Sequence, residues 1–325
     1  MRFAYVSNTK NLASDGKCFN SEWHVGETLK ALGHEVDYIQ EDEITPYSLA
    51  YRVRGADIFL HTRTWPDKVT LEDLKMIEGM GIPTVSWHLD KYTGIQRNGG
   101  LGTDTFWKTQ YVFSPEGSDE AKAIFKSHGI NHFYLPAGVY EPECYLAEPE
   151  LKYMHDIIFV GGGKQYAHSE WPYRAKLVTW LEDTYGSRFK HYGWPDESVR
   201  GEELNKLYAS AKIVIGDSLC KDFKDEYYFS DRVFETTGRG GFIIHPMIRG
   251  LEDHFNIMTA LEPIELVVYP FNNFNKLQTV INYYLNNPYE REKVRLAGHE
   301  RTKRTNTYTQ RMQQMLKVLK DEGAI

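Results

Sequence analysis

The chain has 325 residues, a formal net charge of −7 and three cysteines. This length suits two domains of about 150 residues each, and a mildly acidic chain without long runs of one sign argues against a protein that binds nucleic acid through a broad basic face. Few, widely spaced cysteines and no apolar run near ~18 residues exclude the disulfide-rich and membrane-spanning classes, so we expect a soluble cytoplasmic protein without a signal peptide.

The first half of the chain alternates between predicted strands and helices. A strand over residues 2–8 precedes a helix near Trp23–Leu32, which Gly33 ends before a strand at 35–39. This order is the βαβ pattern of a parallel sheet. The further strands expected here are Asp57–Thr62, Pro83–Leu89, Tyr111–Ser114 and Phe133–Pro136, and the further helices are Leu71–Gly79 and Asp119–His128. The loop at 9–19 lacks the Gly-x-Gly-x-x-Gly pattern, so we expect no dinucleotide site there.

Two strand ends of the first half carry side chains suited to a binding or catalytic site. The strand at 83–89 ends near His88 and Asp90, which alternation places on one face. Either side chain can act as a general base toward a hydroxyl group. The alternative is a histidine hydrogen-bonded within the core and an aspartate that caps the next loop. Arg63 and Trp65, at the end of the strand at 57–62, have the polar and aromatic character of a binding pocket.

A break in the pattern separates the two halves. The segment Val139–Met154 contains prolines and glutamates without periodicity, so we expect it to join domains over 1–150 and 151–325. The pattern then restarts. The strands expected in the second half are 156–160, Arg188–Tyr192, Ile213–Ile215 and 242–246, and the helices are Pro172–Thr184, Gly201–Ser210, one from about 232, Phe274–Asn286, Tyr289–Arg304 and Thr309–Asp321.

Two turns of the second half have compositions suited to ligand contact. Gly161, Gly162 and Gly163 follow a buried strand directly and would let backbone N–H groups approach an anion, to which Lys164 adds charge. The spacing is not that of a Walker P-loop, and a flexible turn is the alternative. Gly193-Trp194 ends the next strand, with an aromatic ring that can stack on a ligand or pack in the core.

The stretch 230–246 is the most informative part of the chain. Ser230 and Asp231 can cap a helix on which Arg232 and Glu235 share one edge, and the glycines after it allow a turn into an apolar strand. Arginine grips phosphate bidentately, and a carboxylate can accept two hydrogen bonds from vicinal hydroxyls. A nucleoside diphosphate has both features. The alternative is a surface ion pair between Arg232 and Glu235.

This unit resembles the signature of the GT-B glycosyltransferases of the group-1 and spore-maturation (CgeB-like) kind. That signature reads Arg-x-Phe-Glu-x-x-x-x-Gly before a short apolar strand, here Arg232, Phe234, Glu235 and Gly240. The resemblance extends over about 156–255 and is much weaker before that. It implies an α/β fold of the GT-B type, in which two Rossmann-like doubly wound domains face each other across a cleft. The final helix, over Tyr308–Leu319, would cross back to the first domain.

The resemblance also implies roles for individual residues. Glu235 would hold the ribose of a nucleotide sugar and Arg232 its diphosphate. The remaining donor contacts would come from Gly161, Gly162, Gly163 and Lys164, from Gly193 and Trp194 at the nucleobase, and from Asp217 after the strand at 213–215. Arg63 and Trp65 would bind the acceptor, with Asp90 or His88 as the catalytic residue. Many members place a second glutamate eight positions before the first, where this chain has Tyr227 beside Glu226, so retention or inversion is not predicted.

The function expected from this resemblance is transfer of a sugar, hexosyl or pentosyl, from a nucleotide-diphosphate sugar to a hydroxyl acceptor. A UDP-sugar is the expected donor substrate, without a tightly bound cofactor or metal. The acceptor stays open among a small molecule, a glycan, a protein and a hydroxylated base in phage DNA, the last implying a host cytoplasm. The alternatives are a sugar-nucleotide epimerase of the GT-B type and a non-catalytic nucleotide-sugar-binding protein.

Overall fold

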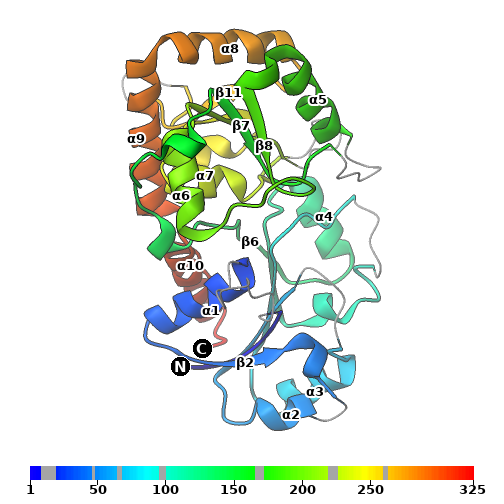
Figure 1. The fold of residues 1–325 in the computed structure, drawn as a ribbon. Helices are drawn as coiled ribbons and strands as arrows, with labels where there is room; N and C mark the ends of the chain where they lie inside the picture. Colours follow the sequence, from blue (N-terminus) through cyan, green and yellow to red (C-terminus); the bar gives the residue numbers. More distant parts are fainter. Residues whose placement is uncertain are drawn as a thin grey trace. The chain divides into compact units, whose positions relative to one another are not determined.

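The chain folds into two α/β units. A computed structural model describes residues 1–8, 20–45, 48–63, 68–94, 100–164, 172–218, 226–258 and 263–325. One unit comprises Met1–Ala137 with Tyr308–Ile325, and the other comprises Gly138–Thr307 (Figure 1). Each contains one sheet of parallel strands with helices packed on it, which confirms the predicted α/β class with two Rossmann-like units. None of the helices described combines the length and the apolar run that crossing a membrane requires.

The first unit is built on a six-stranded parallel sheet of order β2-β1-β3-β4-β5-β6. Its strands are β1 (Arg2–Ser7), β2 (Glu35–Gln40), β3 (Ile58–Arg63), β4 (Thr84–His88), β5 (Tyr111–Ser114) and β6 (His132–Tyr134). Its helices are α1 (Ser21–Ala31), α2 (Ser48–Arg52), α3 (Leu71–Gly79), α4 (Asp119–Ser127) and α10 (Tyr308–Asp321), with short 3-10 turns η1 (Glu41–Glu43) and η2 (Thr105–Lys108).

The central strands of this sheet are buried on both faces, which explains why their sequences are largely continuous apolar runs. All five residues of β4 are buried, and so are the last five of β1. Helix α10 packs beside α1 (Figure 1). The Tyr308 ring of α10 meets the Trp87 ring edge-on, with 6.0 Å between the ring centroids. Arg311 of α10 also donates to the Ala137 carbonyl at 3.0 Å. The last helix is therefore part of the first unit.

The second unit is built on a five-stranded parallel sheet of order β11-β10-β9-β7-β8. Its strands are β7 (Ile157–Val160), β8 (Phe189–Tyr192), β9 (Ile213–Ile215), β10 (Ile243–Pro246) and β11 (Val267–Tyr269). Its helices are α5 (Tyr173–Tyr185), α6 (Gly201–Ser210), α7 (Arg232–Gly238), α8 (Phe274–Asn286) and α9 (Pro288–Thr305), with 3-10 turns η3 (Glu141–Glu143), η4 (Leu151–Tyr153), η5 (Gly186–Arg188) and η6 (Leu251–Asp253).

Successive side chains of the short strands in the second sheet point to opposite faces and join two separate hydrophobic cores. Ile158 and Val160 of β7 join the core under α6 and α7, whereas Ile157 and Phe159 join the core under α5 and α8. Because the strands are parallel, their carboxyl ends share one edge of the sheet, and ligands bind at that edge in such folds.

The segment predicted to join the domains packs on the second unit. Val139 pairs with Thr307, and the Asn205 side chain of α6 donates to the Glu143 carbonyl at 2.8 Å. Val139 also lies over the end of α7, where a Cβ on Gly238 would be 2.6 Å from Val139 Cγ1. Glycine at 238 therefore permits a close approach of this segment to the helix.

Gly238→Ala is expected to destabilise the second unit by about 1–3 kcal/mol through overpacking against Val139. Gly79 is the matched control, because it also ends a helix but nothing lies within 4 Å of its would-be Cβ. Gly79→Ala should stabilise the first unit by roughly 0.5–1 kcal/mol. Urea denaturation followed by circular dichroism measures both changes. Equal effects of the two substitutions would contradict the close approach.

Candidate functional site

A buried carboxylate lies between two arginines at the carboxyl ends of β7 and β9. Asp217 is 0% exposed. Arg174, in the first turn of α5, donates to it from Nε at 2.7 Å, and Arg232, at the start of α7, donates to it from Nη1. Burial alone would raise the pKa of Asp217, but Arg174 and then Arg232 outweigh burial and lower the pKa below its ordinary value. Two guanidinium groups therefore share one buried carboxylate.

Arg232 lies across the glycine turn that follows β7. Its Nε donates to the Val160 carbonyl at 2.5 Å, and a Cβ on Gly161 would be 2.5 Å from its Nη2. Arg174 Nη1 lies 3.4 Å from the Gly162 carbonyl oxygen. Both guanidinium groups also lie over the Phe159 ring: the guanidinium carbon is 5.1 Å from the ring centroid for Arg232 and 5.7 Å for Arg174. The absence of a side chain at 161 therefore makes room for a guanidinium.

The two glycine turns are hydrogen-bonded to each other. The N–H of Gly161 donates to the Tyr192 carbonyl and that of Gly163 to the Trp194 carbonyl, both at 2.8 Å. These two donors are occupied, so they do not approach an anion as the sequence suggested. Gly193 has φ +120°, and a Cβ there would be 2.2 Å from the Gly161 oxygen.

Trp194 and Lys164 are both more exposed than the residues of the buried cluster. Trp194 is 60% exposed, which leaves its ring accessible for stacking. Lys164 Nζ pairs with Glu182 of α5 at 2.7 Å, with both side chains partly exposed. The positive charge at the site therefore comes from the two arginines rather than from Lys164.

Glu235 differs from Asp217 in having no donor. Its side chain is 26% exposed, and among the described residues it pairs with Arg239, whose Nη2 lies 4.0 Å from Glu235 Oε1. Within the described part of the chain its carboxylate accepts no hydrogen bond. Burial raises the pKa of Glu235. A half-buried carboxylate of this kind is suited to accept hydrogen bonds from ligand hydroxyls.

The contacts at the start of this helix differ from one alternative and one expectation drawn from the sequence. Arg232 pairs with Asp217, so the surface ion pair between Arg232 and Glu235 does not form. Asp231 precedes α7 in a helical conformation and makes no side-chain cap, whereas Ser230 Oγ lies 3.4 Å from the Arg232 amide. Helix α7 is thus anchored by the buried guanidinium of Arg232 rather than by an aspartate cap.

The position eight residues before Glu235 supplies no carboxylate. Tyr227 stands there with φ +54°, and the neighbouring Glu226 pairs with Arg249 at 3.0 Å. Glu226 is therefore engaged on the surface.

Sequence reasoning missed Arg174 and His245. Arg174 follows a predicted loop, and nothing in its neighbours signals that its side chain reaches Asp217. His245, in β10, is 0% exposed, and burial lowers its pKa to about 4. Its Nδ1 donates to the Pro246 carbonyl at 2.8 Å, which fixes a neutral ring beside the cluster.

His88 and Asp90 lie at the end of β4 in the first unit. His88 is 2% exposed, stacks on Trp107 at 5.4 Å and places Nδ1 2.7 Å from the Asp90 carbonyl oxygen. Asp90 is only partly buried, and its Oδ1 accepts from the Lys91 amide at 2.8 Å. The histidine is packed in an aromatic cluster, whereas the aspartate reaches the surface of the loop.

A buried glutamate fixes the loop after Asp90. Glu116 accepts from the amides of Tyr92 at 2.9 Å and Thr93 at 3.0 Å. Burial raises the pKa of Glu116. Of the two predicted acceptor residues, Arg63 ends β3 and only its backbone is described, while Trp65 lies outside the described residues.

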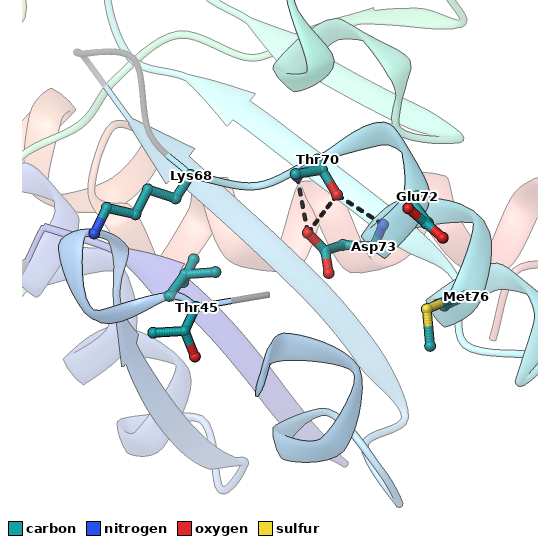
Figure 2. A pocket seen from close by; sticks show the side chains of 7 residues that line it. Thr45, Lys68, Thr70, Glu72, Asp73 and Met76 are labelled. Carbon is teal, nitrogen blue, oxygen red and sulfur yellow. Dashed lines mark hydrogen bonds between the residues drawn. The ribbon is translucent and has the colours of Figure 1, made fainter. Parts of the chain in front are cut away.

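A separate cavity of about 320 Å³ lies in the first unit beside η1 and the start of α3 (Figure 2). Thr70 and Asp73 in its lining form a reciprocal capping box, and Lys68 Nζ donates to the carbonyl of Asp42 outside the lining at 2.8 Å. Among the described residues, none of those predicted from the sequence lines it. Within the described ranges, no three His, Cys, Asp or Glu side chains come together as a metal site requires.

Comparison with known proteins identifies the fold. No curated protein matches the sequence, whereas residues 174–317 match a family model described as Glycosyl transferase-like. An alpha-glucosyltransferase in complex with UDP is similar at 11% identity, 98% coverage of this chain, 100% of that chain and a TM-score of 0.67. Anabaena Alr3699/HepE in complex with UDP is similar at 10% identity, 99% and 100% coverage and a TM-score of 0.60. A glycosyltransferase from Rickettsia africae ESF-5 is similar at 11% identity, 98% coverage of both chains and a TM-score of 0.60. The predicted GT-B fold is therefore confirmed.

Asp217→Asn should lower the free energy of unfolding by about 3–5 kcal/mol at neutral pH, because it removes the carboxylate charge that two buried arginines share. The pKa of Asp217 is lower in the folded protein than in the unfolded chain, so its contribution is complete at neutral pH and is lost as the pH falls through the folded pKa. Urea denaturation across pH measures both effects.

Asp156→Asn is the matched control for this substitution. Asp156 also faces two cations, Arg188 and Lys212, each at 2.6 Å, but both are half-exposed. We expect a loss below about 1 kcal/mol. Equal losses for the two aspartates would contradict the structural role of Asp217.

Proposed function

We propose that this protein is a glycosyltransferase of the group-1 and spore-maturation (CgeB-like) kind, which moves a sugar from a UDP-sugar to a hydroxyl acceptor. The observation that carries the proposal is the presence, at one sheet edge, of the guanidinium groups of Arg174 and Arg232 together with the Glu235 carboxylate, which accepts no hydrogen bond from the described residues. The guanidinium groups would bind the diphosphate and the carboxylate the ribose hydroxyls. Trp194 would stack on the uracil ring.

The same arrangement would stabilise the transition state. The departing UDP gains negative charge as the glycosidic bond breaks, and fixed cations aimed at it lower the barrier. Asp217 holds both arginines in place before the ligand arrives, so little reorganisation is needed. Asp217 itself is fully covered and would position the arginines without touching the donor.

Solved relatives of the fold support the choice of donor. The alpha-glucosyltransferase has been solved with UDP-glucose, and HepE with UDP and glucose. We infer a UDP-hexose as the donor substrate of this protein, with Gly161, Gly162, Gly163, Lys164 and Gly193 shaping the rim of its site.

The acceptor would be bound by the first unit. Asp90 is favoured over His88 as the general base, because the His88 ring is enclosed by aromatic side chains. Arg63 and Trp65 would contribute acceptor contacts. A modified base in DNA is one candidate acceptor, since the alpha-glucosyltransferase has been solved with DNA containing an HMU base. Small molecules, glycans and proteins are the others.

Glu235→Gln is expected to abolish stabilisation by UDP. At 100 times its dissociation constant, UDP should stabilise the wild-type protein by about 2.7 kcal/mol. The thermal shift caused by UDP measures this stabilisation. Glu290→Gln is the control that should keep the shift, because Glu290 is an exposed glutamate paired with Lys293 on α9. A full shift in Glu235→Gln would remove this residue from the site.

Asp90→Asn should lower turnover by about 100-fold or more while leaving the UDP shift intact. UDP release from UDP-glucose is measured with a panel of acceptors that includes DNA carrying hydroxymethylated pyrimidines. Undiminished turnover in this variant would contradict the role of Asp90. UDP-glucose isomerised without any acceptor would instead indicate an epimerase, and binding without either reaction would indicate a non-catalytic protein.

A further inference from the structure

Arg239 is a buried arginine next to Glu235 that the proposed mechanism does not use. It follows α7 directly and is 2% exposed. Its Nη1 donates to Asn205 Oδ1 at 2.6 Å and to the Gly201 carbonyl at 3.1 Å, both on α6. Its Nη2 donates to the Glu143 carboxylate on η3. Three partners from two elements therefore fix the plane of this guanidinium.

The same Nη2 faces Glu235. The two residues are four positions apart, so they share one side of the helix end. The separation of 4.0 Å between Nη2 and Glu235 Oε1 is too long for a hydrogen bond but allows an ion pair. Glu143 and Glu235 thus compete for one nitrogen, and Glu143 holds it in this structure.

Glycines bring Glu143 to this position. A Cβ on Gly238 would meet Val139 at 2.6 Å, and a Cβ on Gly240 would meet Leu146 at 2.5 Å. Gly240 also has φ +77°, a left-handed conformation that favours glycine. The segment that carries Glu143 therefore lies against the end of α7 only because these positions have no side chain.

We propose that Arg239 is a positioning residue for the Glu235 carboxylate, and that Glu143, by pairing with the same guanidinium, weakens the electrostatic interaction between Arg239 and Glu235. The inference rests on the proposed function, because it assumes that Glu235 receives ligand hydroxyls. It adds a residue that touches no ligand and a segment outside the sheet edge to the donor site.

The charges around Glu235 are consistent with this competition. They come from Arg239, Arg232 and Asp231 at the two ends of α7 and from Arg200 before α6. Burial raises the pKa of Glu235, and Arg239 is the largest opposing influence. Burial likewise raises the pKa of Glu143, Arg239 lowers it and Glu235 raises it again.

The test compares Arg239→Met and Glu143→Gln with Arg295→Lys as the control. Arg295 donates to the Gly240 carbonyl at 2.7 Å, so its substitution disturbs the same turn without changing the charge near Glu235. Two quantities are measured against pH: the dissociation constant of UDP by calorimetry, and the titration of the Glu235 carboxyl carbon by NMR in the ligand-free protein, with Glu235→Gln identifying the signal.

Arg239→Met should raise the titration midpoint of Glu235 and weaken UDP binding about tenfold at neutral pH. Glu143→Gln should lower the midpoint and extend UDP binding to lower pH, because one competing carboxylate is removed. This opposite shift keeps the inference testable if Arg239→Met does not fold. Arg295→Lys should change neither quantity.

Unchanged Glu235 titration in Glu143→Gln would overturn the inference even where UDP binds normally. Failure of the wild-type protein to bind UDP would overturn the proposed function alone, and the titration shifts would still decide the coupling among Arg239, Glu143 and Glu235. The two failures are therefore distinguishable.

Discussion

The burial of one carboxylate between two guanidinium groups links the fold of the second unit to its chemistry. Asp217 has no exposure, so it can stay charged only because Arg174 and Arg232 meet it from the starts of two different helices. This requirement fixes α5 and α7 relative to the ends of β7 and β9. It also places two guanidinium groups at one edge of the second sheet.

The neighbouring carboxylates divide into satisfied and unsatisfied groups. Asp217 and Glu143 each receive hydrogen bonds from arginine, whereas Glu235, on the same helix as Arg232, receives none among the described residues. Leaving a half-buried carboxylate without a donor costs free energy, and such a cost is ordinarily found where a ligand supplies the missing partner. This contrast distinguishes the donor side of the protein from its supporting framework.

Sequence patterns predicted most strands and helices, though not β11 or α2, and placed Arg232 and Glu235 on a helix before a short apolar strand, because alternation and glycine turns are local signals. The contacts of Arg174 were not predictable, since 43 residues separate it from Asp217 and only the sheet brings them together. The bonding of the Gly161 and Gly163 amides to the β8 turn was missed for the same reason. Of the two residues expected to cap α7, Ser230 accepts from the Arg232 amide at 3.4 Å, whereas Asp231 makes no side-chain cap. The tertiary pair between Arg232 and Asp217 also holds the start of this helix, and no local signal predicts it.

The return of the chain to its first unit has a consequence for synthesis. The first unit lacks the Trp87–Tyr308 contact and the Arg311 hydrogen bond until residues 308–325 have been synthesised. Residues 138–307, which form the second unit, are continuous in sequence and are synthesised before them. The first unit therefore cannot complete its packing until the whole sequence of the second unit has been made.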